Sequence, residues 1–150
     1  MRGRRATVRS PVALAVAVTV ALAVGGVALG ALPADRPTAA VAVVVDPGTD
    51  RLTLTHRGGD PLDVRRLRLR VRVGGRPLRR QPPVPFFAAR GFRSGPTGPF
   101  NVRADPRWRP GERASLRLAA TNDPLVDPGD RVTVTVLVDG WTVARVAVSA

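Results

Sequence analysis

Hydrophobic and polar residues follow one pattern before residue 33 and another after residue 37. Residues 11–32 (PVALAVAVTVALAVGGVALGAL) form an apolar run without a charged residue. As an α-helix, this run would be roughly 33 Å long, close to the hydrocarbon thickness of a bilayer. After residue 37, apolar and polar residues alternate with a period of two, which is typical of half-buried β-strands. The pattern predicts a transmembrane helix followed by a β-domain.

The β-domain is expected to span residues 38–150 and to contain seven or eight strands. Alternation is cleanest in residues 67–73, LRLRVRV. Asp139-Gly140 stands between two alternating runs and predicts a type I′ hairpin, because that turn needs positive φ at both central positions. Turns at short intervals and no helical period after residue 32 are typical of an antiparallel β-sandwich, of which the immunoglobulin-like arrangement is one form. Strands are expected in residues 38–45, 51–56, 67–73, 76–80, 113–120, 131–138 and 141–149.

Residues 81–111 interrupt this pattern. The segment is rich in proline and glycine and holds all four phenylalanines of the chain. Proline and glycine weaken strand pairing, so we expect a long loop with short strands near residues 84–87 and 100–102. The phenylalanines are expected to plug the open end or edge of a sheet. A binding or subunit-contact loop is the alternative, because loops of this length are often functional.

The N-terminal apolar run allows three interpretations. Residues 1–10 form a basic leader with four arginines, and residues 33–37 form a linker with two prolines. A secretory signal peptide is disfavoured, because its apolar region has roughly 7–15 residues. A plain membrane anchor fits the length, and the arginines would keep the N-terminus in the cytoplasm. In either retained form, Gly26 and Gly30 would let another helix approach closely. The third interpretation rests on a family resemblance.

Residues 4–12 (RRATVRSPV) resemble the processing region of archaeal type IV pilins. Residues 52–62, the strand that ends in Val73-Gly74-Gly75, and residues 129–134 are similar to recurrent stretches of the same family, especially in halophilic archaea. The resemblance implies that a prepilin peptidase cuts between Ala6 and Thr7. It also implies that the helix is retained in the membrane and packs with other pilin-like subunits. The β-domain would then lie outside the cell, in a surface filament or complex with a role in adhesion.

Charge adds a candidate binding surface. The chain has 24 basic residues, all of them arginine, against 11 acidic residues, for a net charge of +13. In a strand, alternate residues share one face and lie roughly 6.6–6.8 Å apart, so a row of arginines could follow an acidic surface polymer. The alternative is a charged edge strand that resists aggregation. Nucleic acid is disfavoured as a partner, because no aromatic residues interleave with the row. The candidate anion contacts are Arg66, Arg68, Arg70 and Arg72.

Catalytic chemistry has few candidates in this chain. It has one histidine and no cysteine, tyrosine or lysine. His56 would be either a base oriented by Asp60 or Asp63, or a turn residue that hydrogen-bonds the backbone. Asp123, Asp127 and Asp130 lack the ligand spacing of an EF-hand calcium loop. We therefore expect no enzyme activity, no cofactor and no metal site.

Two functional hypotheses follow. The first is a pilin-like structural subunit inserted in the cell membrane by a single helix, with its N-terminus in the cytoplasm. The alternative is a membrane-anchored or secreted β-sandwich that binds acidic ligands through its arginine-rich strand.

Overall fold

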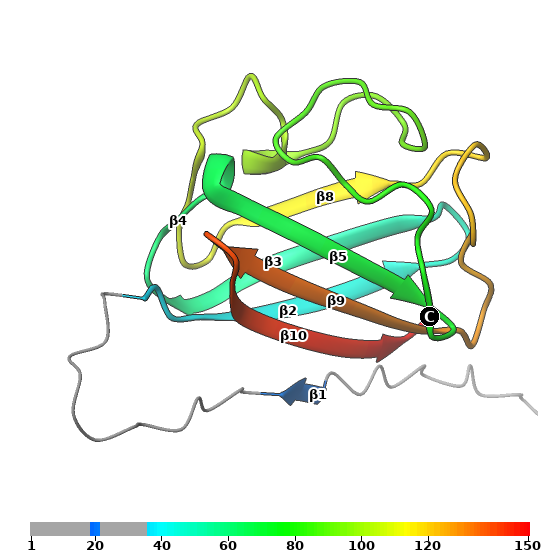
Figure 1. Cartoon of the computed structure of the whole chain (residues 1–150), viewed down its shortest axis with the longest axis horizontal. Coiled ribbons are helices and arrows are strands. Elements are labelled where there is room, and N and C mark those ends of the chain that lie inside the picture. The colour runs from blue at the N-terminus through cyan, green and yellow to red at the C-terminus, as the bar shows by residue number, and fades with distance from the viewer. Residues whose placement is uncertain (1–18, 22–35) are drawn as a thin grey trace, which may run out of the picture.

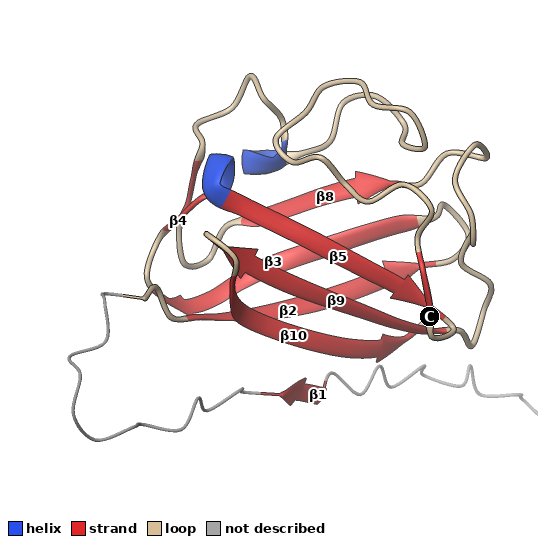
Figure 2. Cartoon of the chain, in the orientation of Figure 1, coloured by secondary structure: helices blue, strands red, loops and turns tan. Residues whose placement is uncertain are grey.

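Two antiparallel β-sheets lie one over the other, with their strands crossing at an angle (Figure 1). The structure is a computed structural model, and it describes residues 19–21 and 36–150. The chain is mainly β, with two short 3₁₀ turns, η1 (Val64–Arg66) and η2 (Gly98–Phe100), as its helical elements among the described residues (Figure 2). The predicted antiparallel β fold is confirmed.

The first sheet has five strands in the order β1-β10-β9-β5-β6, and the second has three in the order β2-β3-β8. A small third sheet pairs β4 with β7. The strands of the first sheet are β1 (Thr19–Ala21), β5 (Leu67–Val73), β6 (Arg76–Pro77), β9 (Arg131–Val138) and β10 (Trp141–Ser149). The others are β2 (Ala39–Asp46), β3 (Arg51–Gly59), β4 (Leu62–Asp63), β7 (Arg107–Trp108) and β8 (Arg113–Arg117).

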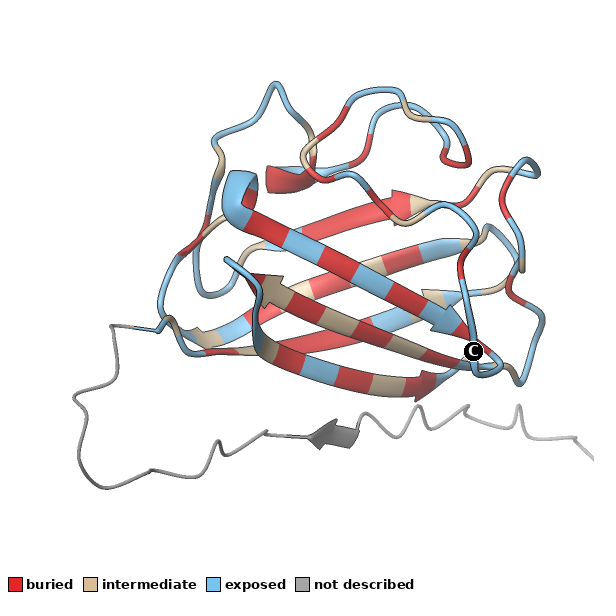
Figure 3. Ribbon diagram, in the orientation of Figure 1, coloured by how far each residue is buried: buried red, intermediate tan, exposed pale blue. Residues whose placement is uncertain are grey.

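Strict alternation places the core between the two large sheets. In β5, every leucine and valine is buried and every arginine is exposed (Figure 3). β9 alternates in the same way, and its four valines are at most 3% exposed. Asp139 and Gly140 have φ values of 48° and 82°, so both central residues of the predicted hairpin turn have positive φ. Two predicted strands are shorter than expected. β6 ends at Pro77, which has no N–H to donate, and β8 ends at Arg117.

The long loop closes the free edge of β8. Thr97 N–H donates to the Ser115 carbonyl at 2.9 Å, and Arg93 N–H donates to the Arg117 carbonyl at 2.9 Å. Phe86, Phe92 and Phe100 are at most 6% exposed, whereas Phe87 is 41% exposed. Three of the four phenylalanines therefore plug the sandwich as expected. The short strands expected within this loop are reduced to one isolated bridge, Phe86 to Asn101.

The start of the sandwich is attached to the β9–β10 hairpin. Arg36 precedes β2, and its guanidinium carbon lies 3.4 Å from the centroid of the Trp141 ring. Trp141 is 52% exposed, so this cation–π contact lies at the surface. It joins the last part of the predicted linker to the opposite end of the chain.

Most of the predicted transmembrane helix lies outside the described residues, as do Ala6, Thr7, Gly26 and Gly30. The three described residues of the apolar run form β1 instead of helix, with Thr19 opposite Ala147 of β10. The transmembrane helix over residues 11–32 stays a prediction, because nearly all of that run lies outside the described residues. Among residues 19–21 and 36–150, no helix has the length and apolar character to span a membrane.

Candidate anion-binding face

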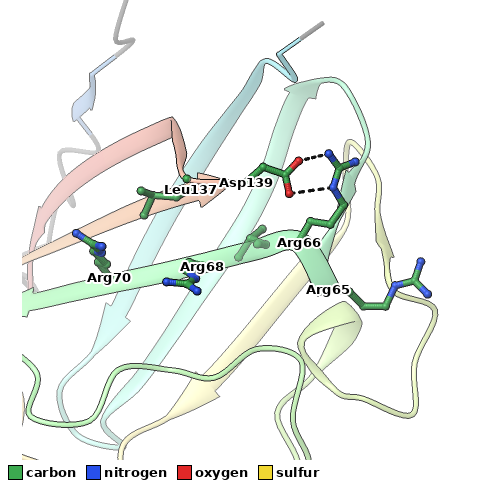
Figure 4. A pocket seen from close by; sticks show the side chains of 8 residues that line it. Arg65, Arg66, Arg68, Arg70, Leu137 and Asp139 are labelled. Carbon is green, nitrogen blue, oxygen red and sulfur yellow. Dashed lines mark hydrogen bonds and ion pairs between the residues drawn. The ribbon is translucent and has the colours of Figure 1, made fainter. Parts of the chain in front are cut away.

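The outward side of the first sheet carries most of the predicted arginine row. Arg68, Arg70 and Arg72 of β5 are exposed, and the residues between them point into the core. Figure 4 shows Arg68 and Arg70 beside the β9–β10 hairpin. An open depression of about 540 Å³ lies between them and Leu137. The sequence pattern alone is sufficient to place these three side chains on one face.

Arg66 is an exception to the predicted row. It belongs to the 3₁₀ turn η1 rather than to β5, and its Nε donates to Asp139 Oδ1 at 3.0 Å. Its Nη2 also pairs with Asp139 Oδ2, so the contact is bidentate (Figure 4). These hydrogen bonds lower the pKa of Asp139 below its ordinary value. Because a carboxylate already occupies Arg66, it is not free to bind a ligand.

Two neighbouring arginines also form ion pairs with carboxylates. Arg65 forms two hydrogen bonds to the Asp63 carboxylate, at 3.0 and 2.8 Å, and Arg76 pairs with Asp123 at 3.1 Å. The Arg65 contact lowers the pKa of Asp63. Arg72 pairs with no carboxylate of the described residues, but its guanidinium donates to the Gly75 carbonyl at 2.8 and 3.1 Å and holds the β5–β6 turn.

Strand register adds two arginines that the sequence analysis did not name. Thr135 of β9 lies opposite Arg70 on one side and opposite Arg145 of β10 on the other. Directly opposed residues share a face, and two strand spacings separate Arg70 from Arg145 by about 9.6 Å at the backbone. Arg131 lies opposite Ser149 near one end of this face. Arg145 and Arg131 are both exposed.

A β-bulge explains why Arg145 was missed. The hairpin pairs Trp141 with Val138 and Thr142 with Leu137, but the register shifts by one residue between Thr142 and Ala144. Without this shift, Thr135 would lie opposite Ala144, and Arg145 would point into the core. The shift is visible in the sequence, because the apolar residues Ala144, Val146 and Val148 occupy even-numbered positions, whereas Val143 occupies an odd-numbered one.

The structure supports the structural interpretation of His56. Its side chain is fully buried, and Nε2 donates to the Asp60 backbone carbonyl at 2.7 Å. The ring packs edge-on to Trp108, with centroids 5.6 Å apart. Within the described part of the chain, Nδ1 has no hydrogen-bond partner. A base would need a carboxylate to orient it, and neither candidate carboxylate does so.

Those carboxylates have other partners. Asp60 accepts a hydrogen bond from Thr38 N–H at 2.9 Å, and Asp63 binds Arg65. Asp130 accepts a hydrogen bond from the Asp127 N–H at 2.9 Å. Over residues 19–21 and 36–150, no three histidine or acidic side chains group as metal ligands would. The exposed arginines of the first sheet therefore form the best-defined candidate site.

Comparison of the chain with protein-family models, curated proteins and solved structures found no match.

Proposed function

We propose that this chain is a pilin-like structural subunit: an exported β-sandwich head carried by a retained apolar helix. In this proposal, a prepilin peptidase cuts between Ala6 and Thr7. Residues 11–32 then remain in the membrane and pass into the core of a surface filament or complex. The N-terminus faces the cytoplasm, and the sandwich faces outside.

The observation that carries the proposal is the order and spacing of the segments. Six residues, 33–38, separate the end of the apolar run at Leu32 from the first long strand of the sandwich, which begins at Ala39. Six extended residues span at most about 20 Å, so the head must stay close to whatever surrounds the apolar run. A short connection suits a subunit whose apolar helix packs against other helices and whose β-domain is displayed outside.

The stretches that resemble archaeal type IV pilins fit this reading because their residues have structural roles. His56 ties the end of β3 to the Asp60 carbonyl. Gly59 has a φ of 98°, and a Cβ there would lie 2.2 Å from the Thr38 carbonyl oxygen. These residues hold the turn between β3 and β4, as expected of a scaffold.

Helix packing is the second part of the proposal. Gly26 and Gly30 would lie one turn apart on a helix and allow a second subunit to approach. In that state, residues 19–21 leave the edge of β10, because the same residues cannot be both strand and helix.

The mature N-terminus tests the proposal. We would express the full chain in an archaeal host that has prepilin peptidase and determine the N-terminus by mass spectrometry. A start at Thr7 is the expected result. An intact Met1 or Arg2 would indicate a plain anchor, a start near Ala31 would indicate secretion, and either result would overturn the proposal. An Ala6→Glu variant should remain uncut, and a Gly3→Ala variant serves as the control.

A further inference from the structure

The outward face of the first sheet carries arginines that no ion pair compensates within the described part of the chain. Among the described residues, the ion pairs engage Arg65, Arg66, Arg76 and Arg109. None of these pairs involves the exposed residues Arg68, Arg70 or Arg145. Three guanidinium groups on one face of a rigid sheet create a positive potential that attracts an anionic partner.

The arginines lie on both sides of β9, with Arg68 and Arg70 on β5 and Arg145 on β10. Arg68 and Arg70 of β5 are about 6.7 Å apart along the strand, and Arg145 lies about 9.6 Å across the sheet from Arg70. Between them, Thr133 and Thr135 of β9 point outward and are half-buried. The face therefore offers charges at the sides and, along the middle, two hydroxyl groups and the half-buried Leu137 opposite Arg68.

This combination favours one class of partner. A peripheral membrane site combines basic residues with apolar side chains that enter the lipid. Among the described residues, the large apolar side chain on this face is Leu137, which lies opposite Arg68 and is half-buried. The exposed large apolar residues Val44, Phe87, Val102, Leu125 and Trp141 lie elsewhere. Single-stranded nucleic acid is bound by aromatic platforms, which this face lacks among the described residues. A polymer rich in both acidic and hydroxyl groups matches this face, because its acidic groups can pair with the arginines and its hydroxyl groups with the threonines between them.

We propose that this face binds an acidic polysaccharide. Arg68, Arg70 and Arg145 pair with its carboxylate or sulfate groups, and Thr133 and Thr135 exchange hydrogen bonds with its hydroxyl groups. Arg131 extends the basic surface at one end. The inference goes beyond the proposed structural role and does not depend on it, because a head of this kind could bind the polymer whether or not it is part of a filament.

The test is binding of the full chain, in a neutral detergent, to immobilised polysaccharides. Alginate provides carboxylates, dextran sulfate provides sulfates, and dextran is the uncharged control. The variant Arg68→Gln/Arg70→Gln/Arg145→Gln removes the three free charges. The matched control, Arg51→Gln/Arg57→Gln/Arg113→Gln, removes three exposed charges from strands β3 and β8 of the second sheet. Thermal unfolding shows that each variant is folded.

We expect alginate or dextran sulfate to bind, dextran not to bind, and affinity to fall as salt rises. The first variant should lose roughly tenfold to a hundredfold in affinity, which is the effect of three exposed ion pairs, while the control stays within about threefold of the native chain. Thr135→Val should weaken binding and leave the salt dependence unchanged. The proposal is overturned if both triple variants lose affinity equally, if neither acidic polysaccharide binds, or if oligo(dT) or anionic lipid vesicles bind more tightly.

Discussion

Replacing His56 by alanine should destabilise the sandwich substantially. The substitution removes a fully buried ring that packs against Trp108 and donates to the Asp60 carbonyl at 2.7 Å. Removing a buried side chain of this size costs about 2–3 kcal/mol when the site collapses in part. The lost hydrogen bond costs about 1 kcal/mol more, which is the typical net contribution of one such bond. We therefore expect the free energy of unfolding to fall by about 3–4 kcal/mol.

His56→Phe separates the two contributions. Phenylalanine keeps a ring beside Trp108 but loses the hydrogen bond and is larger than imidazole, so its expected cost is about 2 kcal/mol. The exposed neighbour provides the control: Arg57→Ala should change the free energy of unfolding by less than about 0.5 kcal/mol.

Urea unfolding of the full chain measures these differences. Trp108 is buried and Trp141 is exposed, so a Trp141→Phe background leaves Trp108 as the only tryptophan reporter. A transition midpoint that falls without a change in slope reports a change in stability alone. If His56→Ala stayed within 1 kcal/mol of the native chain, or if the phenylalanine variant lost as much as the alanine variant, the packing role assigned to His56 would be wrong.

Three further predictions concern the same domain. Gly98→Ala should destabilise more than Gly95→Ala in urea unfolding: both residues have positive φ, but only a Cβ at Gly98 would lie 2.2 Å from the Arg113 carbonyl oxygen. Gly95→Ala should cost about 1–2 kcal/mol from its backbone conformation alone. Stability measured against pH should fall in acid, because hydrogen bonds lower the folded-state pKa of Asp63 and Asp139 from the ordinary 3.8. Their contribution is complete above that value and is lost as pH falls through the lower folded-state pKa, so Asp139→Asn should reduce the acid dependence. Trp141→Ala should cost about 0.5–1 kcal/mol by removing the Arg36 contact, while Trp141→Phe should retain part of it.

Local pattern was sufficient for much of the fold. The alternation of residues 67–73 predicted β5, and Asp139-Gly140 predicted the hairpin and its positive φ values. In both cases, the determining interactions lie within a few residues. Burial of three phenylalanines in the long loop followed from composition, since large apolar rings need a place in the core.

Features that depend on distant residues could not be predicted. Arg66 and Asp139 are 73 positions apart, and only the β5–β9 pairing brings them together. The outward position of Arg145 depends on one extra residue in β10, which the turn signal does not report. The strand at residues 19–21 requires the open edge of β10, whereas local hydrophobicity favours a helix. The sequence pattern therefore predicted the arginines of β5 on the candidate face but not Arg145 of β10.

The contact between Arg36 and Trp141 has a mechanical consequence. In the proposed subunit, where residues 11–32 form a helix, residues 33–35 connect that helix to Arg36 on the hairpin, a reach of about 10 Å. One surface cation–π contact contributes only about 0.5–1 kcal/mol, so thermal motion breaks it readily. In that subunit, loss of the contact would release Arg36 and lengthen the connection between the helix and the sandwich.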